Sequence, residues 1–234
     1  MEVSRIPIRH EYKYHVTRGE LAYLRRALGA VLRPDPHGDE RNEYHIRSLY
    51  FDTVDDDALH DKIAGTPDRR KYRIRIYNHS DGNIRLECKA KMNDLISKQS
   101  VSIPRDLCEQ LMACDPTGLE YMRHPLLREM YREMKLRLLH PVVIVDYVRE
   151  AYLHEAEEVR ITFDKQLRTG LNSVDLFNPH IPTYSPFDDP WEVLEVKYNQ
   201  FLPSYIQGLL SSVTAVRSAV SKYVWCRRFE NKEF

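Results

Sequence analysis

The chain has 234 residues, 42% of them hydrophobic, and its 35 lysine and arginine residues balance its 35 aspartate and glutamate residues. This composition provides for a sizeable core and disfavours a nucleic-acid binder that works through bulk positive charge. No run approaches the roughly 20 apolar residues needed to span a bilayer, and the four cysteines form no CxxC pair, so we expect reduced thiols in a cytoplasmic protein with no direct membrane insertion.

The first helix is predicted to begin at Thr17, because Thr17 and Glu20 have the spacing of a capping box. Pro34 and Pro36 should end it. The apolar residues at helical spacing after the cap are Leu21, Leu24, Leu28 and Val31. Residues 33–43 then look like a polar loop, and residues 55–62 like a short helix or turn.

Strand-like runs with short connections follow. The predicted strands cover residues 8–14, 46–52, 70–78, 84–91, 97–103, 142–152, 159–166 and 192–198. A hairpin turn is expected at residues 79–82. Further helices are expected at residues 104–113, 124–138, 204–211 and 213–228. The order favours one α+β domain over residues 1–234, with an antiparallel eight-stranded sheet closed into a barrel and the helices packed outside.

Glycine is scarce, at 8 residues, and neither GxxxxGK[ST] nor GxGxxG occurs. A nucleotide bound by this chain would therefore not be held by a P-loop or a dinucleotide-binding turn.

Alternation along the strands sorts the charges. Because side chains in a strand point alternately to opposite faces, residues two apart share a face. On most predicted strands one face is charged and the other is apolar. The charged faces carry Lys13, Lys71, Arg73, Arg75, Arg85, Lys89, Lys91, Arg149, Arg160 and Lys197 against Glu11, Glu87, Asp164 and Glu195. This is a net charge of +6 on a neutral protein.

A sheet with one face in water also commonly has a charged face. The pattern of a single strand therefore cannot distinguish a solvent-facing sheet from one that lines a tunnel. Like charges two apart, as at Arg73 and Arg75, nevertheless favour an anion between them, since desolvated cations without a counter-charge cost several kcal/mol each. A phosphate chain offers many oxygens to arginine forks. The few carboxylates would then hold a hard divalent cation, which commonly bridges phosphates with one or two protein ligands.

Eight motifs in register resemble the VTC domain, the catalytic domain of the vacuolar transporter chaperone complex, which has bacterial relatives and belongs to the triphosphate tunnel metalloenzyme superfamily. The motifs are RHEYKY (9–14), SLYFD (48–52), KYRIRIY (71–77), LECK (86–89), YVR (147–149), RITFD (160–164), LEVKY (194–198) and SKY (221–223). The resemblance covers about residues 6–226. It implies an antiparallel eight-stranded tunnel that binds a triphosphate unit and, in eukaryotic members, makes polyphosphate from ATP with a divalent metal.

The resemblance also implies roles for single residues. The phosphate-binding catalytic ring corresponds to Lys13, Arg73, Arg75, Lys89, Arg149 and Lys222. Auxiliary substrate contacts are Tyr147 and Ser221, with Lys98 as a candidate for a further tunnel lysine, and the cationic faces add Lys91, Arg160 and Lys197. Glu195 corresponds to the ligand of Mn²⁺ or Mg²⁺, and Glu11 and Glu87 are further metal candidates. Glu87, between Arg85 and Lys89, is equally an ion-pair partner.

One departure bears on the reaction. Tripolyphosphatases of the superfamily carry Glu-x-Glu-x-Lys on the first strand, whereas this chain has Arg9 in place of the first glutamate. Fewer carboxylates weaken the case for activating a hydrolytic water, which favours a polyphosphate polymerase acting on ATP, triphosphate and polyphosphate. A tripolyphosphatase or nucleoside triphosphatase, and a non-enzymatic polyphosphate-binding module, stay open as alternatives. A membrane-bound partner also stays open.

Overall fold

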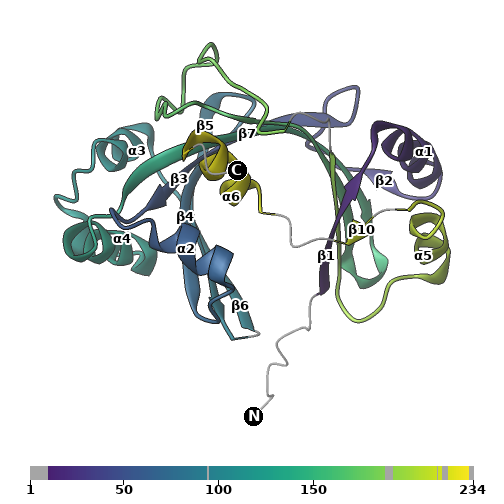
Figure 1. The fold of residues 1–234 in the computed structure, drawn as a ribbon, viewed down its shortest axis with the longest axis horizontal. Coiled ribbons are helices and arrows are strands. Elements are labelled where there is room, and N and C mark those ends of the chain that lie inside the picture. The colour runs from purple at the N-terminus through teal and green to yellow at the C-terminus, as the bar shows by residue number, and fades with distance from the viewer. Residues whose placement is uncertain (1–9, 94, 188–191, 215, 218–220, 232–234) are drawn as a thin grey trace. The chain divides into compact units, whose positions relative to one another are not determined.

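The computed structural model describes residues 10–93, 95–187, 192–214, 216–217 and 221–231, and Figure 1 shows its helices and strands. The helices are α1 (Arg18–Gly29), α2 (Asp57–Ala64), α3 (Arg105–Met112), α4 (Pro125–Leu136), α5 (Ser204–Leu210) and α6 (Lys222–Asn231), with short 3₁₀ turns at Leu119–Tyr121 and Ala156–Glu158. None of the described helices is both long and apolar enough to cross a bilayer.

The strands form one antiparallel sheet in the order β10-β1-β9-β8-β7-β3-β4-β5-β6, with β2 paired to β7. They are β1 (His10–Val16), β2 (Arg33–Pro34), β3 (Glu43–Asp52), β4 (Arg69–Tyr77), β5 (Ser80–Met92), β6 (Leu95–Ser102), β7 (His140–His154), β8 (Val159–Thr169), β9 (Glu192–Tyr198) and β10 (Val216–Arg217). All eight predicted strands have a counterpart, which confirms the α+β class and the antiparallel sheet. The first two residues of the strand predicted at 8–14 lie outside the described residues.

The chain divides into two compact units whose segments interleave in the sequence. Unit 1 contains residues 1–44, 147–167 and 187–220, and unit 2 contains residues 45–146, 168–186 and 221–234. Strands β3, β7 and β8 run from one unit into the other. The expectation of one domain over residues 1–234 stays a prediction.

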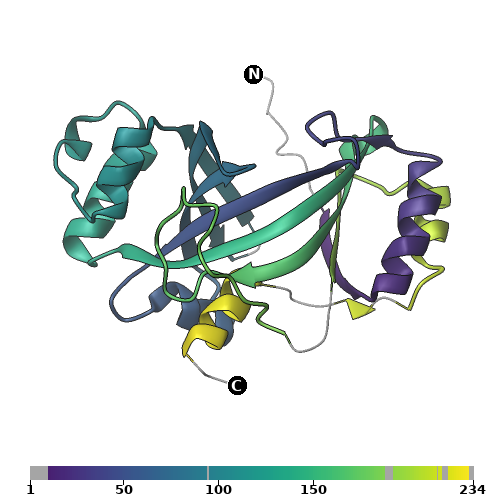
Figure 2. The same cartoon turned by 90° about the horizontal axis from the view of Figure 1, so that it is seen from above.

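In unit 1, helices α1 and α5 lie side by side (Figures 1 and 2) and cover the apolar face of the strands. The core that they close includes Leu24, Leu28, Phe163, Leu194 and Ile206, all buried. Alternation along β8 and β9 therefore leaves the charged residues on the opposite face, as the sequence predicts.

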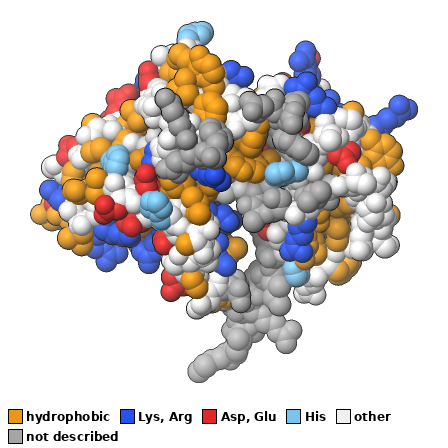
Figure 3. Space-filling model, viewed as in Figure 1, with side chains coloured by type: hydrophobic (Ala, Val, Ile, Leu, Met, Phe, Trp, Pro, Cys, Tyr) orange, Lys and Arg blue, Asp and Glu red, His pale blue; other side chains and the backbone are white. Residues whose placement is uncertain are grey.

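In unit 2, helices α3 and α4 supply the matching cover for β4 and β5 (Figure 1). Ile74 and Leu86 on the strands pack in one cluster with Leu111 and Met130 on the helices. The arginines and lysines between these apolar positions again take the other face of the sheet. The side of the chain seen in Figure 3 mixes acidic, basic and hydrophobic side chains, in keeping with the zero net charge.

The predicted capping box forms at the start of α1. Glu20 N–H donates to Thr17 Oγ1 at 3.2 Å, and Thr17 N–H donates to Glu20 Oε2 at 2.8 Å. The helix ends earlier than expected, however, at Gly29. Val31 consequently falls beyond the helix and is exposed, so the prediction that it continues the helical spacing of apolar residues is wrong.

Two local predictions need correction. The β4–β5 turn lies at Asn78–His79, where φ is +50° and +55°, and not at residues 79–82. Two positive φ angles define the hairpin turn whose twist matches that of the strands, and asparagine tolerates this conformation. The last helix begins at Lys222 rather than at residue 213, because Val216 and Arg217 pair with β1.

Candidate functional site

Strand register in unit 2 gathers cations on one sheet face. Lys71 lies opposite Lys89, and Lys89 lies opposite Lys98, so three lysines stand in one row across β4, β5 and β6. The same face carries Arg69, Lys71, Arg73, Arg75, Arg85, Lys89, Lys91 and Lys98, and its carboxylates are Asp52 and Glu87. We call this the cationic face. Like charges directly opposite each other are unfavourable without an anion nearby.

Glu87 organises the centre of the cationic face. Arg73 donates from Nε and Nη2 to Glu87 Oε2 at 2.7 and 2.6 Å, and Lys98 Nζ lies 2.5 Å from Glu87 Oε1. Burial alone would raise the pKa of this carboxyl, but the charges of Arg73 and Arg75 outweigh it and lower the pKa to about 2. Glu87 is therefore ionised at neutral pH and fixes the Arg73 guanidinium in place.

Neutral side chains from β3 orient the two arginines further. Arg73 Nη1 donates to Tyr50 Oη at 2.8 Å, and Arg75 Nε donates to Ser48 Oγ at 3.1 Å. Burial would raise the pKa of Tyr50, yet the charges of Arg73 and Arg75, with a smaller contribution from Lys222, lower it. Three cations of the predicted ring thus act on one buried tyrosine.

Helix α6 brings the SKY motif to the same place within unit 2. The Tyr223 hydroxyl donates to Asp52, and its ring lies 5.0 Å from the ring of Tyr50. Lys71 Nζ stands 4.6 Å from the Tyr223 ring centroid and 3.4 Å from Ser221 Oγ. Asp52 also accepts from the backbone N–H groups of Ala58 and Leu59, so one buried carboxylate joins α6 to the start of α2.

Unit 1 carries a different charged face. Lys13 lies opposite Glu195, and Glu11 lies opposite Lys197, on paired strands β1 and β9. Lys13 Nζ stands 3.1 Å from Glu11 Oε1 and 3.6 Å from Glu195 Oε2, and Lys197 forms an ion pair with Glu195. Burial would lower the pKa of the Lys13 ammonium, but the two glutamates overcome this and raise it.

Arg149 forms a bidentate pair in unit 1. Its Nε and Nη2 donate to the two carboxylate oxygens of Asp164 at 2.6 and 2.9 Å, and Nη2 lies 3.4 Å from Tyr147 Oη. Burial would lower the pKa of Arg149, but the charge of Asp164 outweighs burial, and the pKa is raised. Arg160 donates to Asp35 at 2.9 Å. We call this set of residues the balanced face: Glu11, Lys13, Arg149, Arg160, Asp164, Glu195 and Lys197.

The balanced face has donors that suit a hard divalent cation. The Glu11 and Glu195 carboxylates converge on one cationic centre, the Lys13 ammonium. Thr162 Oγ1 lies opposite Glu195, is buried and has no hydrogen-bond partner among the described residues. Among the residues that the structure describes, no group of three His, Cys, Asp or Glu side chains is placed to hold a metal ion by itself. The residues therefore fit an ion that takes its remaining ligands from phosphate and water.

The structure sorts the predicted site residues into two groups, one per unit. Unit 2 contains Arg73, Arg75, Glu87, Lys89, Lys91, Lys98, Ser221 and Lys222, and unit 1 contains Glu11, Lys13, Tyr147, Arg149, Arg160, Glu195 and Lys197. Of the two readings of Glu87, the ion pair is the one that the structure contains. Its role as a metal ligand stays a prediction, as do the other residue roles.

Several site residues were not among the predicted ones. Ser48 and Tyr50 hold Arg75 and Arg73, and Asp164, which the sequence places on a charged face without a role, holds Arg149. Alternation along SLYFD (48–52) places Ser48 and Tyr50 on one face, but their partners depend on the pairing of β3 with β4. The sequence alone contains no signal for that pairing.

A family model confirms the resemblance. The model of the VTC domain matches residues 8–229, nearly the whole chain. The chain belongs to the VTC domain family. Among curated proteins, none has a sequence that matches this chain.

Known structures share the fold of this VTC domain. A putative adenylyl cyclase from Hippeastrum, described as having a dominant triphosphatase activity, aligns with a TM-score of 0.57 at 16% identity and 96% coverage of both chains. A putative adenylate cyclase from Bacillus halodurans aligns with a TM-score of 0.54 at 11% identity, covering 92% of this chain and 94% of that one. At these identities the likeness concerns the fold alone.

Proposed function

We propose that this VTC domain is a polyphosphate-forming phosphotransferase, which moves the γ-phosphoryl group of ATP onto the end of a polyphosphate chain. The observation that carries the proposal is the cationic face, with eight basic side chains and two carboxylates on paired strands. Membership of the VTC family directs the choice of substrate to polyphosphate.

The cationic face would bind the phosphates. Phosphoryl transfer needs positioning and neutralisation of charge more than covalent help from the protein. Arg73 and Arg75 are held by Glu87, Tyr50 and Ser48, so their forks are ordered before a phosphate arrives. Pre-ordered donors lose little entropy on binding and stabilise charge as it develops.

Lys89 and Lys222 would add point charges on the same unit. Lys89 stands between Lys71 and Lys98 in the lysine row, and Lys222 starts helix α6 next to Ser221. In the balanced face, Lys13 and Arg149 would contact phosphate oxygens, with Tyr147 oriented beside Arg149. Asp164 and Tyr147 together occupy three of the five guanidinium donors, which leaves Arg149 the two on Nη1 for a phosphate.

Glu195 and Glu11 would hold the divalent metal. A bound Mn²⁺ or Mg²⁺ neutralises charge on the transferred group and orients it. Lys13 and Lys197, which pair with these carboxylates, would contact phosphate oxygens beside the ion. The attacking oxygen belongs to the terminal phosphate of the chain and ADP leaves, so the protein supplies no nucleophile.

A triphosphatase is the second candidate. The likeness in fold to the Hippeastrum protein, with its triphosphatase activity, favours it. In this reaction water replaces the polyphosphate end as the acceptor, and the same basic residues bind the substrate. Arg9, at a position where tripolyphosphatases carry glutamate, is the sequence feature that weighs against it.

The proposed location is the cytoplasm. All four cysteines are free thiols, and Cys88, Cys108 and Cys226 are buried, as is usual for proteins of reducing compartments. The proposed ligands are ATP, triphosphate and polyphosphate, with no nucleic acid.

Incubation with ATP and Mn²⁺ or Mg²⁺, followed by a gel stained for polyphosphate, tests the proposal. Long chains together with ADP are the expected result. Release of orthophosphate without chains would support the triphosphatase instead. Absence of turnover with any triphosphate, together with retained binding, would leave a polyphosphate-binding module.

A further inference from the structure

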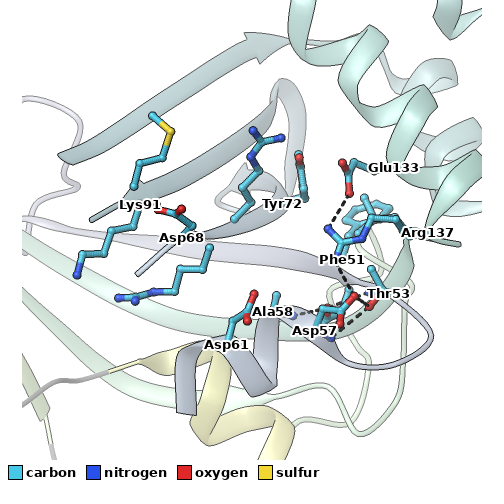
Figure 4. Close-up of a pocket in the computed structure, with 15 residues that line it drawn as sticks. Phe51, Thr53, Asp57, Ala58, Asp61, Asp68, Tyr72, Lys91, Glu133 and Arg137 are labelled. Carbon is cyan, nitrogen blue, oxygen red and sulfur yellow. Dashed lines mark hydrogen bonds and ion pairs between the residues drawn. The ribbon is translucent and has the colours of Figure 1, made fainter. Parts of the chain in front are cut away.

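A pocket of about 270 Å³ opens in unit 2 at one end of the cationic face (Figure 4). Arg69 and Lys91 lie opposite each other on β4 and β5, belong to the cationic face and line this pocket. They continue a row of cross-strand pairs that runs through Lys71–Lys89 to Arg73–Glu87. With a rise of roughly 3.3 Å per residue, Arg73 lies about 13 Å along the strand from Arg69.

The lining of the pocket differs from the cationic face. It contains four cations and five carboxylates, which are Arg69, Arg70, Lys91 and Arg137, and Asp52, Asp57, Asp61, Asp68 and Glu133. A polyanion would meet at least as much repulsion as attraction here, because the carboxylates outnumber the cations by one. A mixed lining suits an uncharged group with several hydrogen-bonding atoms instead.

The walls add apolar surface. Phe51, Ala58 and Leu139 line the pocket and are buried. The volume lies just below the range of roughly 300–1,000 Å³ typical of sites for drug-sized ligands. A small flat group with an apolar face and polar edges, such as a nucleobase with its sugar, matches this combination.

Four of the five carboxylates already have partners. Asp52 accepts from Tyr223 and from the backbone N–H groups of Ala58 and Leu59. Asp57 accepts from Thr53 Oγ1 and from Arg137 Nη2, both at 2.7 Å, and Glu133 also pairs with Arg137. Asp68 accepts from the backbone N–H of Asn93 at 3.1 Å. Among the described residues, Asp61 is the carboxylate of the pocket whose side chain has no such partner. It lies one turn after Asp57 on α2 (Figure 4).

We propose that this pocket holds the nucleoside of ATP, so that the protein distinguishes a nucleoside triphosphate from inorganic triphosphate. Asp61 accepts hydrogen bonds from the ribose hydroxyls, as acidic residues do in other nucleotide sites. The base lies against the apolar wall, and Arg69 and Lys91 contact the α-phosphate. The β- and γ-phosphates extend along the row toward Lys71, Lys89 and Arg73. This inference rests on the proposed function.

Calorimetry with the full chain and Mg²⁺ tests the pocket through a double comparison. ATP, 2′,3′-dideoxy-ATP and tripolyphosphate are each titrated into the wild type and into Asp61→Ala. The wild type should bind ATP about tenfold or more tightly than the dideoxy nucleotide, because a hydrogen bond to a charged group contributes roughly 1.5–3 kcal/mol and 1.4 kcal/mol is tenfold. In Asp61→Ala this preference should disappear, while tripolyphosphate affinity stays within about twofold.

Asp55→Ala is the matched control. Asp55 is an exposed carboxylate next to the same helix and does not line the pocket, so its loss changes the net charge equally and should leave the preference intact. Equal affinity of the wild type for ATP and the dideoxy nucleotide, or an unchanged preference in Asp61→Ala, would overturn the pocket while the proposed function stands. If neither ATP nor tripolyphosphate binds the wild type, the proposed function fails and the nucleoside pocket with it.

Discussion

The two units present sheet faces of contrasting charge. On the balanced face of unit 1 four cations, Lys13, Arg149, Arg160 and Lys197, meet three carboxylates, Glu11, Asp164 and Glu195, and Asp35 adds a fourth. On the cationic face of unit 2, as far as the structure describes it, eight basic side chains meet two carboxylates, Asp52 and Glu87. The first face supplies its own counter-charges, whereas the second has an excess that an external anion would relieve.

This contrast suggests a division of labour. The carboxylates of the balanced face can serve as oxygen ligands of a divalent ion, so this face suits metal binding. A persistent excess of arginine and lysine suits a ligand with many phosphate oxygens. The expected consequences can be ranked by size.

The largest expected effect is on stability in unit 1. The side chain of Asp164 is fully buried and that of Arg149 is 11% exposed. Asp164→Ala should lower the free energy of unfolding by roughly 3–5 kcal/mol, because it leaves a buried guanidinium without its counter-charge. Urea unfolding measures the loss. Glu155→Gln, in an exposed pair with Arg33, is the control and should cost less than about 1 kcal/mol. Equal costs would mean that the balanced face does not stabilise itself.

The next effect concerns Glu87 and acid. Its pKa in the folded protein is about 2, against an ordinary 4.5, so its stabilisation is complete above about pH 4.5 and is lost as the pH falls toward 2. The loss amounts to roughly 3 kcal/mol, since one pH unit corresponds to about 1.4 kcal/mol. Glu87→Gln should remove this part of the acid dependence in unfolding measured between pH 2 and 5. Glu109→Gln, in an exposed helical pair, should not. An unchanged acid profile in Glu87→Gln would contradict the assigned pairing.

A smaller effect concerns affinity. Arg75→Met keeps the apolar stem of the side chain and removes one guanidinium from the cationic face. Tripolyphosphate should bind roughly ten to a hundred times more weakly, because a charge-assisted hydrogen bond contributes about 1.5–3 kcal/mol. Arg105→Met, an exposed arginine outside the cationic face, should bind as the wild type does. Calorimetry compares the two, and similar affinities would remove Arg75 from the phosphate-binding set.

The smallest expected effect is thermal. At ten times its dissociation constant, tripolyphosphate should stabilise the fold by about 1.4 kcal/mol through mass action. Sulfate at equal ionic strength should raise the melting temperature much less. Equal shifts would mean that general screening of charge is sufficient, and that the excess on the cationic face selects no particular anion.

Much of this arrangement follows from local rules. The period of two in KYRIRIY (71–77) and LEVKY (194–198) separates charged from apolar residues, and both strands show that separation in the structure. The capping box at Thr17 likewise depends on four consecutive residues. Such patterns also carry the family motifs, which is why the VTC resemblance was visible in the sequence.

What the sequence did not reveal depends on contacts between distant segments. Asp164 lies 15 residues from Arg149, and Tyr223 lies 171 residues from Asp52. The last helix begins later than its helical pattern predicts, because the pairing of Val216 and Arg217 with β1 is a contact between distant segments. The pocket beside Asp61 also arises only when α2, α4 and the ends of β4 and β5 meet.

Glu195→Gln gives the most direct test of the division of labour. The change keeps the shape of the side chain and removes the charge that would hold the metal. Tripolyphosphate binding is measured by calorimetry with and without Mn²⁺, and turnover of ATP is followed in parallel. We predict that Glu195→Gln binds tripolyphosphate as well as or better than the wild type without metal, gains nothing from Mn²⁺ and loses at least a hundredfold in turnover, since a metal contributes several kcal/mol to transition-state stabilisation. Full turnover and an undiminished gain from Mn²⁺ in this variant would contradict the account.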